Sequence, residues 1–538
     1  MKAMVNIIGA GLAGLSAAVT LAKAGIGCRL FSRQSSERAQ SVMAEGGINA
    51  ALDTMGEGDT TAEHFSDTMK GGVYLADPNA VRGLTEGAPD IVREFVRLGV
   101  PFQMKGETLV LRNFGGQKKK RTAYAKSSTG KMLMSALIDE CRKYEARGLV
   151  MRFPHHDFLS LVTEGGAVTG CAIGDTFTGD RLVFSGPVIL SAGGPAGLFS
   201  GHTTGTTQNT GDAAATAFFH GVRFANLEFI QYHPTTVGIS GKRMLISEAA
   251  RGEGGRLFIE RNGRPWYFME EKYPELKNLM PRDVVSREIY AVCRDPECGG
   301  QAYLDMTHLS DDTWRGKLSD LREECIHFLG IDPAAEHLPV EPGIHYFMGG
   351  IWVDERHRTN IKNLLAAGEC ACQYHGANRL GGNSLLGAVY GGKTAAETLS
   401  RDILSAPGYM EGFEHAPAGE PTVLSGNERD PAFERRLTDI LMEGLGIVRS
   451  EEGMRLCIER IEALLKEDGM SDRMKARASL GLAMAKSAIM RRESRGSHFR
   501  RDCPERDDEN YKKTSTAVCI DGRVITGYLD IPPLRETV

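Results

Sequence analysis

The N-terminal residues follow the order of a strand, a tight turn and a helix. A short apolar run, VNII, precedes a segment, LAGLSAAVTLAK, with apolar and small side chains at helical spacing. Gly9, Gly11 and Gly14 form a GxGxxG pattern at the turn. Glycines at this spacing allow a sharp turn, close approach of the backbone to a pyrophosphate and packing of the helix on the strand. The pattern predicts a dinucleotide-binding turn that also includes Ala10.

The next predicted strand, GCRLFSRQ, ends at Ser32 and Arg33. An acidic residue that binds a ribose is usual at this point of an NAD-binding fold. Its absence argues against a simple NAD-binding domain and leaves Ser32 and Arg33 as the candidate cofactor contacts.

Two later segments repeat the order of strand, glycine, polar residue and helix. The first contains the predicted strand LVFSGPVILSAGG and continues through Asp212 into a helix, and the second begins with NLLAAGE. Segments of this kind complete one parallel sheet. We therefore expect an α/β, doubly wound, Rossmann-like domain made of residues 1–231 and 341–405, interrupted by an α+β capping domain at residues 232–340.

The C-terminal part has a different pattern. Apolar residues recur at helical spacing between Asp430 and Arg495, which predicts a helical bundle within a domain at residues 425–500. The proline- and glycine-rich residues 405–430 are typical of a linker, and residues 501–538 are expected to form a C-terminal tail.

The composition is that of a large globular protein. The 538 residues are 41% hydrophobic and 25% charged, enough for two or three domains, and a net charge of -5 gives no basic footprint for nucleic acid. We interpret the one basic cluster, QKKKR, as a solvated loop. No apolar run reaches the roughly 18 residues that a membrane helix needs. We expect a cytoplasmic protein that meets a membrane only through partner subunits.

Eleven cysteines are spread along the chain without a CxxC pair. This distribution predicts reduced thiols rather than disulfides, a zinc site or an iron-sulfur cluster, and no haem-attachment CxxCH is present. A redox site in this chain would therefore exchange electrons with something outside it.

Five middle segments combine His, Arg or Glu with small residues, a composition that suits close approach of a ligand. They are EFIQYHPTT, LISEAARGEGG, PRDVVSRE, GIHYFMGG and HGANRLGGNSLLG. Taken singly, His233 and His345 would be interpreted as structural histidines, and Arg282 as a surface charge beside Asp283. Their occurrence together with a nucleotide fingerprint favours one shared site.

The motifs resemble those of the flavoprotein subunits of the succinate dehydrogenase and fumarate reductase family, which also includes L-aspartate oxidase. The resemblance runs nearly from end to end, in the family's order, through GAGLAGLSAA, MAEGG, RNFGGQ, RTAYAKSSTGK, TGD, EFIQYHPT, SEAARGEGG, PRDVVSR, HYFMGGI, AAGE, HGANRLGGNSLL and ESRGSHFRRDCPERDDEN. It implies a two-part FAD-binding domain, an inserted capping domain and a C-terminal helical region.

By resemblance, the glycine-rich turn holds the FAD pyrophosphate, while Asp212 and Glu369 hold ribose or ribityl hydroxyls. Ser384 and Leu385 would approach the isoalloxazine from the start of a helix, whose positive end stabilises negative charge on a reduced flavin. The loop RAQSVMAEGG would add contacts from Ser41, Gly46 and Gly47.

The implied substrate is a four-carbon dicarboxylate. Arg379 matches the family's carboxylate-clamping arginine, a role that suits a planar two-pronged cation. Ser247 stands where the family often has threonine, which preserves the hydroxyl. The other implied substrate contacts are His233, His345, Phe114 and Gly46.

In the implied reaction, a hydride from flavin N5 reaches one alkene carbon and Arg282 gives a proton to the other. A free guanidinium has a pKa above about 12 and gives up protons reluctantly, so this role requires immediate reprotonation. Glu248 and Arg251 match the family's proton relay.

Position 40 departs from the membrane-complex members, in which a histidine bonds covalently to the flavin. Gln40 cannot form that bond, which implies noncovalent FAD with a lower reduction potential. A lower potential makes succinate a poor electron donor and leaves fumarate a good acceptor, so we expect the chain to favour fumarate reduction.

L-aspartate oxidase and a reductase of another unsaturated acid stay open as alternatives. The oxidase shares most motifs and noncovalent FAD, although RNFGGQKKKRTAYAKSSTGK is closer to the dehydrogenase and reductase branch. A nicotinamide-dependent disulfide flavoenzyme is disfavoured because the chain has no second GxGxxG and no redox cysteine pair. The family's usual electron partner is an iron-sulfur subunit.

Overall fold

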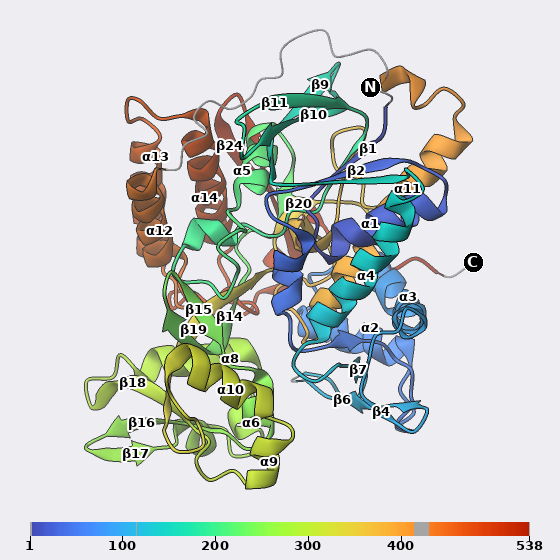
Figure 1. The fold of residues 1–538 in the computed structure, drawn as a ribbon. Coiled ribbons are helices and arrows are strands. Elements are labelled where there is room, and N and C mark those ends of the chain that lie inside the picture. The colour runs from blue at the N-terminus through green and yellow to red at the C-terminus, as the bar shows by residue number, and fades with distance from the viewer. Residues whose placement is uncertain (1–2, 115, 414–429, 537–538) are drawn as a thin grey trace.

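The computed structural model describes residues 3–114, 116–413 and 430–536. Figure 1 shows a centre of strands and long helices, a yellow-green α+β region below it, and a brown-red helical bundle on the left. Most of the predicted linker, residues 414–429, and the last two residues of the predicted tail lie outside the described residues.

A five-stranded parallel sheet forms the centre, in the order β21–β12–β1–β2–β8. Its strands are β1 (Val5–Ile8), β2 (Cys28–Ser32), β8 (Val150–Pro154), β12 (Val188–Leu190) and β21 (Leu364–Ala366). The sheet joins the first strand of the chain to one more than 350 residues later, which confirms the doubly wound fold class. All four residues of β1 are buried, as expected for a strand covered on both faces.

Long helices pack on this sheet or on one another, and short elements lie around it and in the inserted region. The main helices are α1 (Leu12–Lys23), α3 (Pro78–Arg97), α4 (Thr129–Glu145) and α11 (Asn383–Ser405), with α2 (Thr61–Gly71) and α5 (Asp212–Phe219) nearby. The short strands are β3 (Ile48–Asn49), β4 (Met104–Lys105), β5 (Thr108–Leu109), β6 (Leu111–Arg112) and β7 (Thr122–Ala123). The 3-10 helices are η1 (Ser36–Arg38), η2 (Gln40–Met43), η3 (Ala196–Phe199), η4 (Lys277–Leu279), η5 (Gly368–Cys370) and η6 (Glu411–Phe413).

The apolar run LVFSGPVILSAGG forms two strands rather than the single strand predicted. The first half of the run lies in β11 (Arg181–Ser185), which forms an antiparallel sheet with β10 (Ala167–Asp175) and β9 (His156–Glu164). The second half forms β12 of the central sheet. Gly186 separates them with a φ of +132°, and a Cβ at this residue would collide with the carbonyl oxygen of Met4. Glycine alone tolerates this backbone, so the chain changes sheets there.

The inserted region carries a six-stranded sheet and its own buried core. The strands are β14 (Ile230–Ile239), β15 (Lys242–Leu245), β16 (Arg256–Arg261), β17 (Arg264–Trp266), β18 (Cys298–Asp305) and β19 (Leu338–Phe347). The helices are α6 (Glu248–Gly252), α7 (Phe268–Lys272), α8 (Arg282–Val292), α9 (Asp311–Arg315) and α10 (Ser319–Leu329). A separate apolar cluster lies between residues 237 and 340. The long strands β14 and β19 cross both expected boundaries of this region.

Three helices form the predicted bundle: α12 (Pro431–Leu445), α13 (Glu451–Leu464) and α14 (Asp472–Met490). The expected tail contains α15 (Asp508–Tyr511) and a β hairpin, β23 (Lys513–Ile520) and β24 (Arg523–Asp530). The hairpin joins β13 (Phe224–Ala225), β20 (Gly350–Trp352) and β22 (Ala371–Cys372) in one sheet. Among the described residues, no helix is both long and apolar enough to span a bilayer.

The first residues of the motif ESRGSHFRRDCPERDDEN are largely buried, whereas most of residues 501–510 are exposed, and an ion-pair network with Arg491 and Glu228 holds the buried part. Arg491 pairs with Glu228 at 2.7 Å and with Glu493 at 2.9 Å, and Arg495 pairs with Glu493 at 2.7 Å. The four side chains are fully buried. Since Glu228 directly precedes β14, this network fixes the C-terminal segment to the strand that carries His233.

Candidate active site

One long cavity follows the carboxyl ends of the central strands and reaches the inserted region. Nearly all residues predicted to bind a cofactor or substrate line it: Gly9, Ala10, Gly11, Ser32, Arg33, Ser41, Gly46, Gly47, Phe114, Asp212, His233, Ser247, Glu248, Arg282, His345, Glu369, Arg379, Ser384 and Leu385. Gly14 and Arg251 are not among the residues that line the cavity. Residues far apart in the sequence thus meet at one site, where an open parallel sheet is expected to bind its ligand.

The glycine-rich turn leaves the backbone open to the cavity. Gly9 has a φ of +108°, and a Cβ there would collide with the carbonyl oxygen of Ser191. A Cβ on Gly14 would collide with the carbonyl oxygen of Gly9. Helix α1 starts after Gly11 with no acidic residue in its first turn. A positive helix end beside such a turn fits a diphosphate group.

The two predicted hydroxyl-binding acids have different surroundings. Glu369 Oε1 accepts a hydrogen bond from the Phe347 amide at 3.0 Å. Burial raises the pKa of Glu369 to about 7, although this amide and Arg379 act in the opposite direction. Asp212 already accepts hydrogen bonds from two arginines of α14, as described below.

Asp212 joins the cavity wall to the helical bundle. Its carboxylate accepts hydrogen bonds from Arg473 and, at 2.8 Å, from Arg477. Burial alone would raise the pKa of Asp212, but the two arginines lower it to about 2. Arg473 itself lines the cavity, so the bundle forms part of the wall.

A buried polar network fixes the start of α11, which presents Ser384 and Leu385 to the cavity. Asn383 Oδ1 accepts hydrogen bonds from Asn49 at 2.7 Å and interacts with His64 Nε2 at 3.0 Å. Gln117 Nε2 donates to Asn49 at 3.0 Å. Gly382 precedes the helix with a φ of +81°. The network joins four segments at the point where the helix faces the cavity.

The loop that carries Gly46 and Gly47 is held from behind by Arg112. The Arg112 guanidinium donates hydrogen bonds to the carbonyl oxygens of Glu45 and Gly46. It also stacks 4.3 Å from the ring centre of Tyr124 and 5.2 Å from that of Phe114. Phe114 thereby becomes part of the same wall as the glycines.

Arg282 and Glu248 form a two-pronged ion pair in the part of the cavity nearest the inserted region. Glu248 Oε2 accepts hydrogen bonds from Arg282 Nε at 2.9 Å and from Nη2 at 2.7 Å. Arg251 Nη2 lies 3.9 Å from Glu248 Oε1, and its Nη1 donates to the Asn278 carbonyl at 2.6 Å. The three predicted catalytic side chains are therefore in contact, in the order Arg282, Glu248 and Arg251.

Two histidines face each other beside this pair. The rings of His233 and His345 lie 5.4 Å apart, edge to face. Burial, with the charge of Arg282 next, holds the pKa of each far below the usual histidine range, so both rings are neutral near pH 7. His345 Nδ1 lies 2.9 Å from Thr204 Oγ1.

Arg379 completes this part of the site from the segment before α11. Its Nη2 donates to Gln231 Oε1 at 3.0 Å, and its guanidinium lies 4.4 Å from the ring centre of Tyr346. Burial lowers the pKa of Arg379 to about 10, which leaves it charged at neutral pH.

The cations here outnumber the carboxylates. Arg282 Nη1 and Arg379 Nε are buried and have no hydrogen-bond partner within the part of the chain that the structure describes. Unpaired buried donors are costly unless a ligand satisfies them. This part of the cavity therefore fits an anion.

Sequence reasoning missed other residues of the wall. Arg473 comes from a helix of ordinary amphipathic pattern, and nothing in its local sequence identifies it. Thr206, Gln208 and Asn209 lie in a polar loop that was recognised only for Asp212. The QKKKR loop lies outside the cavity, and Lys119 and Lys120 pair with Glu63 and Glu57.

Comparisons with known proteins identify the family of the chain. Residues 5–385 match the family described as FAD binding domain, and residues 470–531 match the one described as fumarate reductase flavoprotein C-term. The chain is 36% identical to the succinate dehydrogenase flavoprotein subunit of Bacillus subtilis, over 96% of this chain and 94% of that one. It is 34% identical to an L-aspartate oxidase of Streptomyces coelicolor, over 95% and 91%.

Solved structures show the same relationship. A quinol-fumarate reductase solved with menaquinol molecules matches with a TM-score of 0.87 and 29% identity, over 100% of both chains. The fold and the cofactor class predicted from the sequence are thereby confirmed. The chain is an FAD-dependent oxidoreductase and belongs to the flavoprotein family of succinate dehydrogenases and fumarate reductases, in which L-aspartate oxidases also occur.

Proposed function

We propose that this chain interconverts fumarate and succinate and favours fumarate reduction. The observation that carries this proposal is the Arg282–Glu248 ion pair, which faces two neutral histidines in a cavity with unpaired guanidinium donors. These groups suit a small molecule with two carboxylates that needs a proton during its reaction.

Recognition of the dicarboxylate rests on Arg379, Ser247 and the two histidines. The Arg379 Nε–H, which lacks a partner among the described residues, can donate to a carboxylate while Nη2 stays bound to Gln231. A guanidinium that is already fixed loses little freedom when it binds a planar carboxylate. We propose that Phe114 and Gly46 bound the substrate on the opposite side.

The proton in this proposal comes from Arg282. Its guanidinium keeps one unpaired nitrogen for the substrate while the other two donate to Glu248. Glu248 can return a proton at once because it contacts Arg282 directly, and Arg251 lies within 3.9 Å on its other side. Fixed cations also stabilise the negative charge that develops beside a substrate carboxylate.

FAD, when bound, would supply the electron pair for this reduction. We propose that the turn at Gly9, Gly11 and Gly14, together with Ala10, Ser32 and Arg33, faces its diphosphate and ribose. Further proposed contacts are Ser41, Gly47, Asp212, Glu369, Ser384 and Leu385. We propose an FAD-binding domain at residues 1–231 and 341–405, a capping domain at 232–340 and a C-terminal helical domain.

The decisive experiment substitutes Arg282. We expect Arg282→Ala to keep its FAD content, measured by absorbance, and to lose fumarate turnover by at least about 10³-fold, because general acid catalysis contributes typically 10²–10⁴-fold and a charge is lost as well. Arg287→Ala, on the same helix and paired with Asp283, is the control and should retain turnover. Near-normal turnover by Arg282→Ala would refute the proposed role.

Two further parts of the proposal have their own tests. Gln40 supports noncovalent FAD, so acid precipitation should release the yellow cofactor into the supernatant, and flavin in the pellet would contradict this. We propose an iron-sulfur subunit as the electron partner, and through it any contact with a membrane. Copurification with a cysteine-rich subunit would support this, and its absence would favour another electron donor.

L-aspartate oxidation is the second candidate, favoured by the 34% identity to an L-aspartate oxidase. The same cationic groups would accept the two carboxylates of aspartate. Formation of oxaloacetate and hydrogen peroxide from L-aspartate in air, without fumarate-dependent turnover, would select this candidate. A reductase of another unsaturated acid would instead show faster turnover with that acid than with fumarate.

A further inference from the structure

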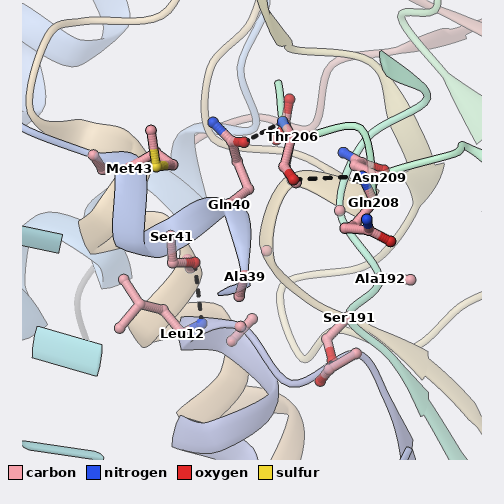
Figure 2. A pocket seen from close by; sticks show the side chains of 18 of the residues that line it. Leu12, Ala39, Gln40, Ser41, Met43, Ser191, Ala192, Thr206, Gln208 and Asn209 are labelled. Atoms are coloured by element: carbon pink, nitrogen blue, oxygen red, sulfur yellow. Dashed lines mark hydrogen bonds between the residues drawn. The ribbon is translucent and has the colours of Figure 1, made fainter. Parts of the chain in front are cut away.

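The side chains of Gln40 and Ser41 attach one short segment to both walls of the flavin cavity (Figure 2). This crossing segment, residues 39–43, contains the 3-10 helix η2. Ser41 Oγ accepts a hydrogen bond from the Leu12 amide at 3.2 Å, at the first turn of α1. Gln40 Oε1 accepts a hydrogen bond from the Thr206 amide at 2.6 Å, in the loop before α5.

The Thr206 end of this connection belongs to a turn that forms the cavity wall. The Thr206 carbonyl accepts from the Asn209 amide at 3.0 Å, and its hydroxyl accepts from the Gln208 amide at 3.4 Å. Gln208 and Asn209 both line the cavity. Thr206 therefore uses its carbonyl and hydroxyl within the turn and its N–H to reach the crossing segment.

We propose that Gln40 is a positioning residue that holds the two walls of the FAD cavity together. It does so by the hydrogen bond to Thr206, on the side opposite the Ser41–Leu12 contact. Loss of this bond should therefore speed the release of FAD, because the crossing segment and the turn can then separate more easily. The proposal rests on noncovalent FAD, for which a slow rate of cofactor release depends on the protein walls alone.

The side-chain chemistry at position 40 makes specific demands. The acceptor must lie at the end of a side chain as long as glutamine to meet the backbone N–H. Glutamate supplies an acceptor of the same length, and a charged acceptor makes a stronger bond. Methionine has a similar length and volume but lacks a comparable acceptor. Gln40→Glu and Gln40→Met are therefore a matched pair.

The test measures the rate of FAD release from the flavin-loaded protein after dilution, followed by the fluorescence of free FAD. We expect Gln40→Met to release FAD about fivefold faster, the effect of losing one hydrogen bond of about 1 kcal/mol. Gln40→Glu should stay within twofold of the unaltered protein. Equal rates for all three proteins would overturn the proposal.

Substitutions at Thr206 separate this connection from a direct contact of Gln40 with FAD. Thr206→Pro removes the N–H donor, whereas Thr206→Ala keeps the N–H and removes the hydroxyl and the methyl group. We expect Thr206→Pro to accelerate release as Gln40→Met does, Thr206→Ala to change it little, and the double variant Gln40→Met with Thr206→Pro to add nothing further, since both break one bond. Additive effects in the double variant, or no acceleration in a folded Thr206→Pro protein, would refute the connection.

Acid precipitation of the flavin-loaded protein distinguishes failure of noncovalent FAD binding from failure of the proposed role of Gln40. Flavin in the protein pellet would refute noncovalent binding itself. Flavin in the supernatant, together with a rate of FAD release that Gln40→Met does not change, would leave noncovalent binding intact and refute the role of Gln40. Melting curves of each apoprotein show whether a faster release reflects loss of the fold rather than of the Gln40–Thr206 bond.

Discussion

The two ends of the cavity both combine arginines with carboxylates, but in different proportions. At the substrate end, Glu248 is the carboxylate in contact with Arg282 and Arg251, and Arg379 adds a third cation. At the bundle end, Asp212 accepts hydrogen bonds from both Arg473 and Arg477. At the substrate end three arginines share one carboxylate, whereas at the bundle end each carboxylate oxygen has its own arginine. Buried guanidinium nitrogens without a partner among the described residues occur at both ends, including Nε of Arg477.

This difference indicates what each cluster does. Arg282 and Arg379 line the cavity, so their nitrogens that have no partner among the described residues can bind an anion that enters it. Arg477 is not among the residues that line the cavity. At the bundle end, Arg477 donates to Asp212 and to the carbonyls of Thr210 and Gly197, so its terminal nitrogens are used within the fold. We infer that the first cluster serves catalysis and that the second joins two parts of the structure.

Among the substitutions that test this comparison, the one at Arg379 should have the largest effect on activity. Arg379→Met should lower kcat/KM for fumarate by about 10²–10³-fold, because removing one partner of a buried charged hydrogen bond costs typically 2–5 kcal/mol. Its melting temperature should change little, since a charge that repels Arg282 is also removed. Steady-state kinetics and thermal melting provide the two measurements.

A control for Arg379 comes from an arginine of the loop between β20 and β21, whose carboxylate partner lies in α11. Arg358 pairs with Asp402 near the surface at 2.6 Å, and such pairs contribute little. Arg358→Met should keep kcat/KM within about twofold. Equal losses in both variants would mean that Arg379 has no special contact with the substrate.

The second effect is on stability at the bundle end. Arg477→Met should lower the free energy of unfolding by about 3 kcal/mol, the usual cost of breaking a buried ion pair, because Asp212 then loses one of its two hydrogen-bonded arginines. The folded fraction should still reduce fumarate once saturated with FAD. Urea denaturation measures the stability, and a large loss of kcat with unchanged stability would contradict the structural role of Arg477.

The contrast also explains what the sequence could predict. The substrate end is built from short motifs in which His, Arg or Glu stands near small residues. His233, Glu248, Arg282 and Arg379 are not distinctive singly, but their motifs occur together with the nucleotide fingerprint, which made a shared site predictable. The bundle end depends on Arg473 and Arg477, which lie more than 250 residues from Asp212 in a helix of ordinary pattern. Only the folded chain brings them together.

The same reasoning applies to the fold. The glycine turn and the strands around it follow from local pattern, because each buried parallel strand is a continuous apolar run. The change of sheet at Gly186 and the hairpin of β23 and β24 were not predicted. Both depend on contacts between distant segments: Gly186 packs on Met4, and β23 pairs with β13.

The third prediction concerns the protonation of His233 at the substrate end. His233 Nδ1 lies 3.1 Å from the Thr235 carbonyl, which can only accept, so Nδ1 carries the proton and Nε2 of the neutral ring has none. A bound dianion needs a hydrogen-bond donor, which Nε2 becomes only when the ring is protonated. The dianion's negative charge also offsets the nearby cations that, after burial, lower the pKa of His233. We expect substrate binding to take up a proton, and affinity to fall up to about tenfold per pH unit as pH rises.

Calorimetry in two buffers of different ionisation enthalpy counts the protons taken up. His233→Gln keeps an amide donor but cannot titrate, so proton uptake should decrease and the affinity should depend less on pH. An unchanged proton count in this variant would assign the uptake to another group, such as His345.

The smallest expected effect on activity concerns Glu45, which lines the cavity beside Ser247. Burial and then the nearby Glu324 raise the pKa of Glu45 to about 8, from a usual value near 4.5, against smaller opposite effects of Ser247 and Arg112. Near pH 7 this carboxyl is therefore protonated. It adds no second negative charge to the substrate end, where the excess of cations persists.

Between these two pKa values the folded state binds a proton that the unfolded state has lost. The free energy of unfolding should therefore decrease as pH rises from about 5 to about 8, by up to about 1.4 kcal/mol per pH unit. Glu45→Gln should reduce this slope when urea denaturation is compared at both pH values, and the slope that remains is expected from Glu369, whose pKa is also raised, to about 7. A slope that is unchanged in Glu45→Gln would mean that Glu45 is ionised at neutral pH, and the substrate end would then hold two carboxylates against three arginines.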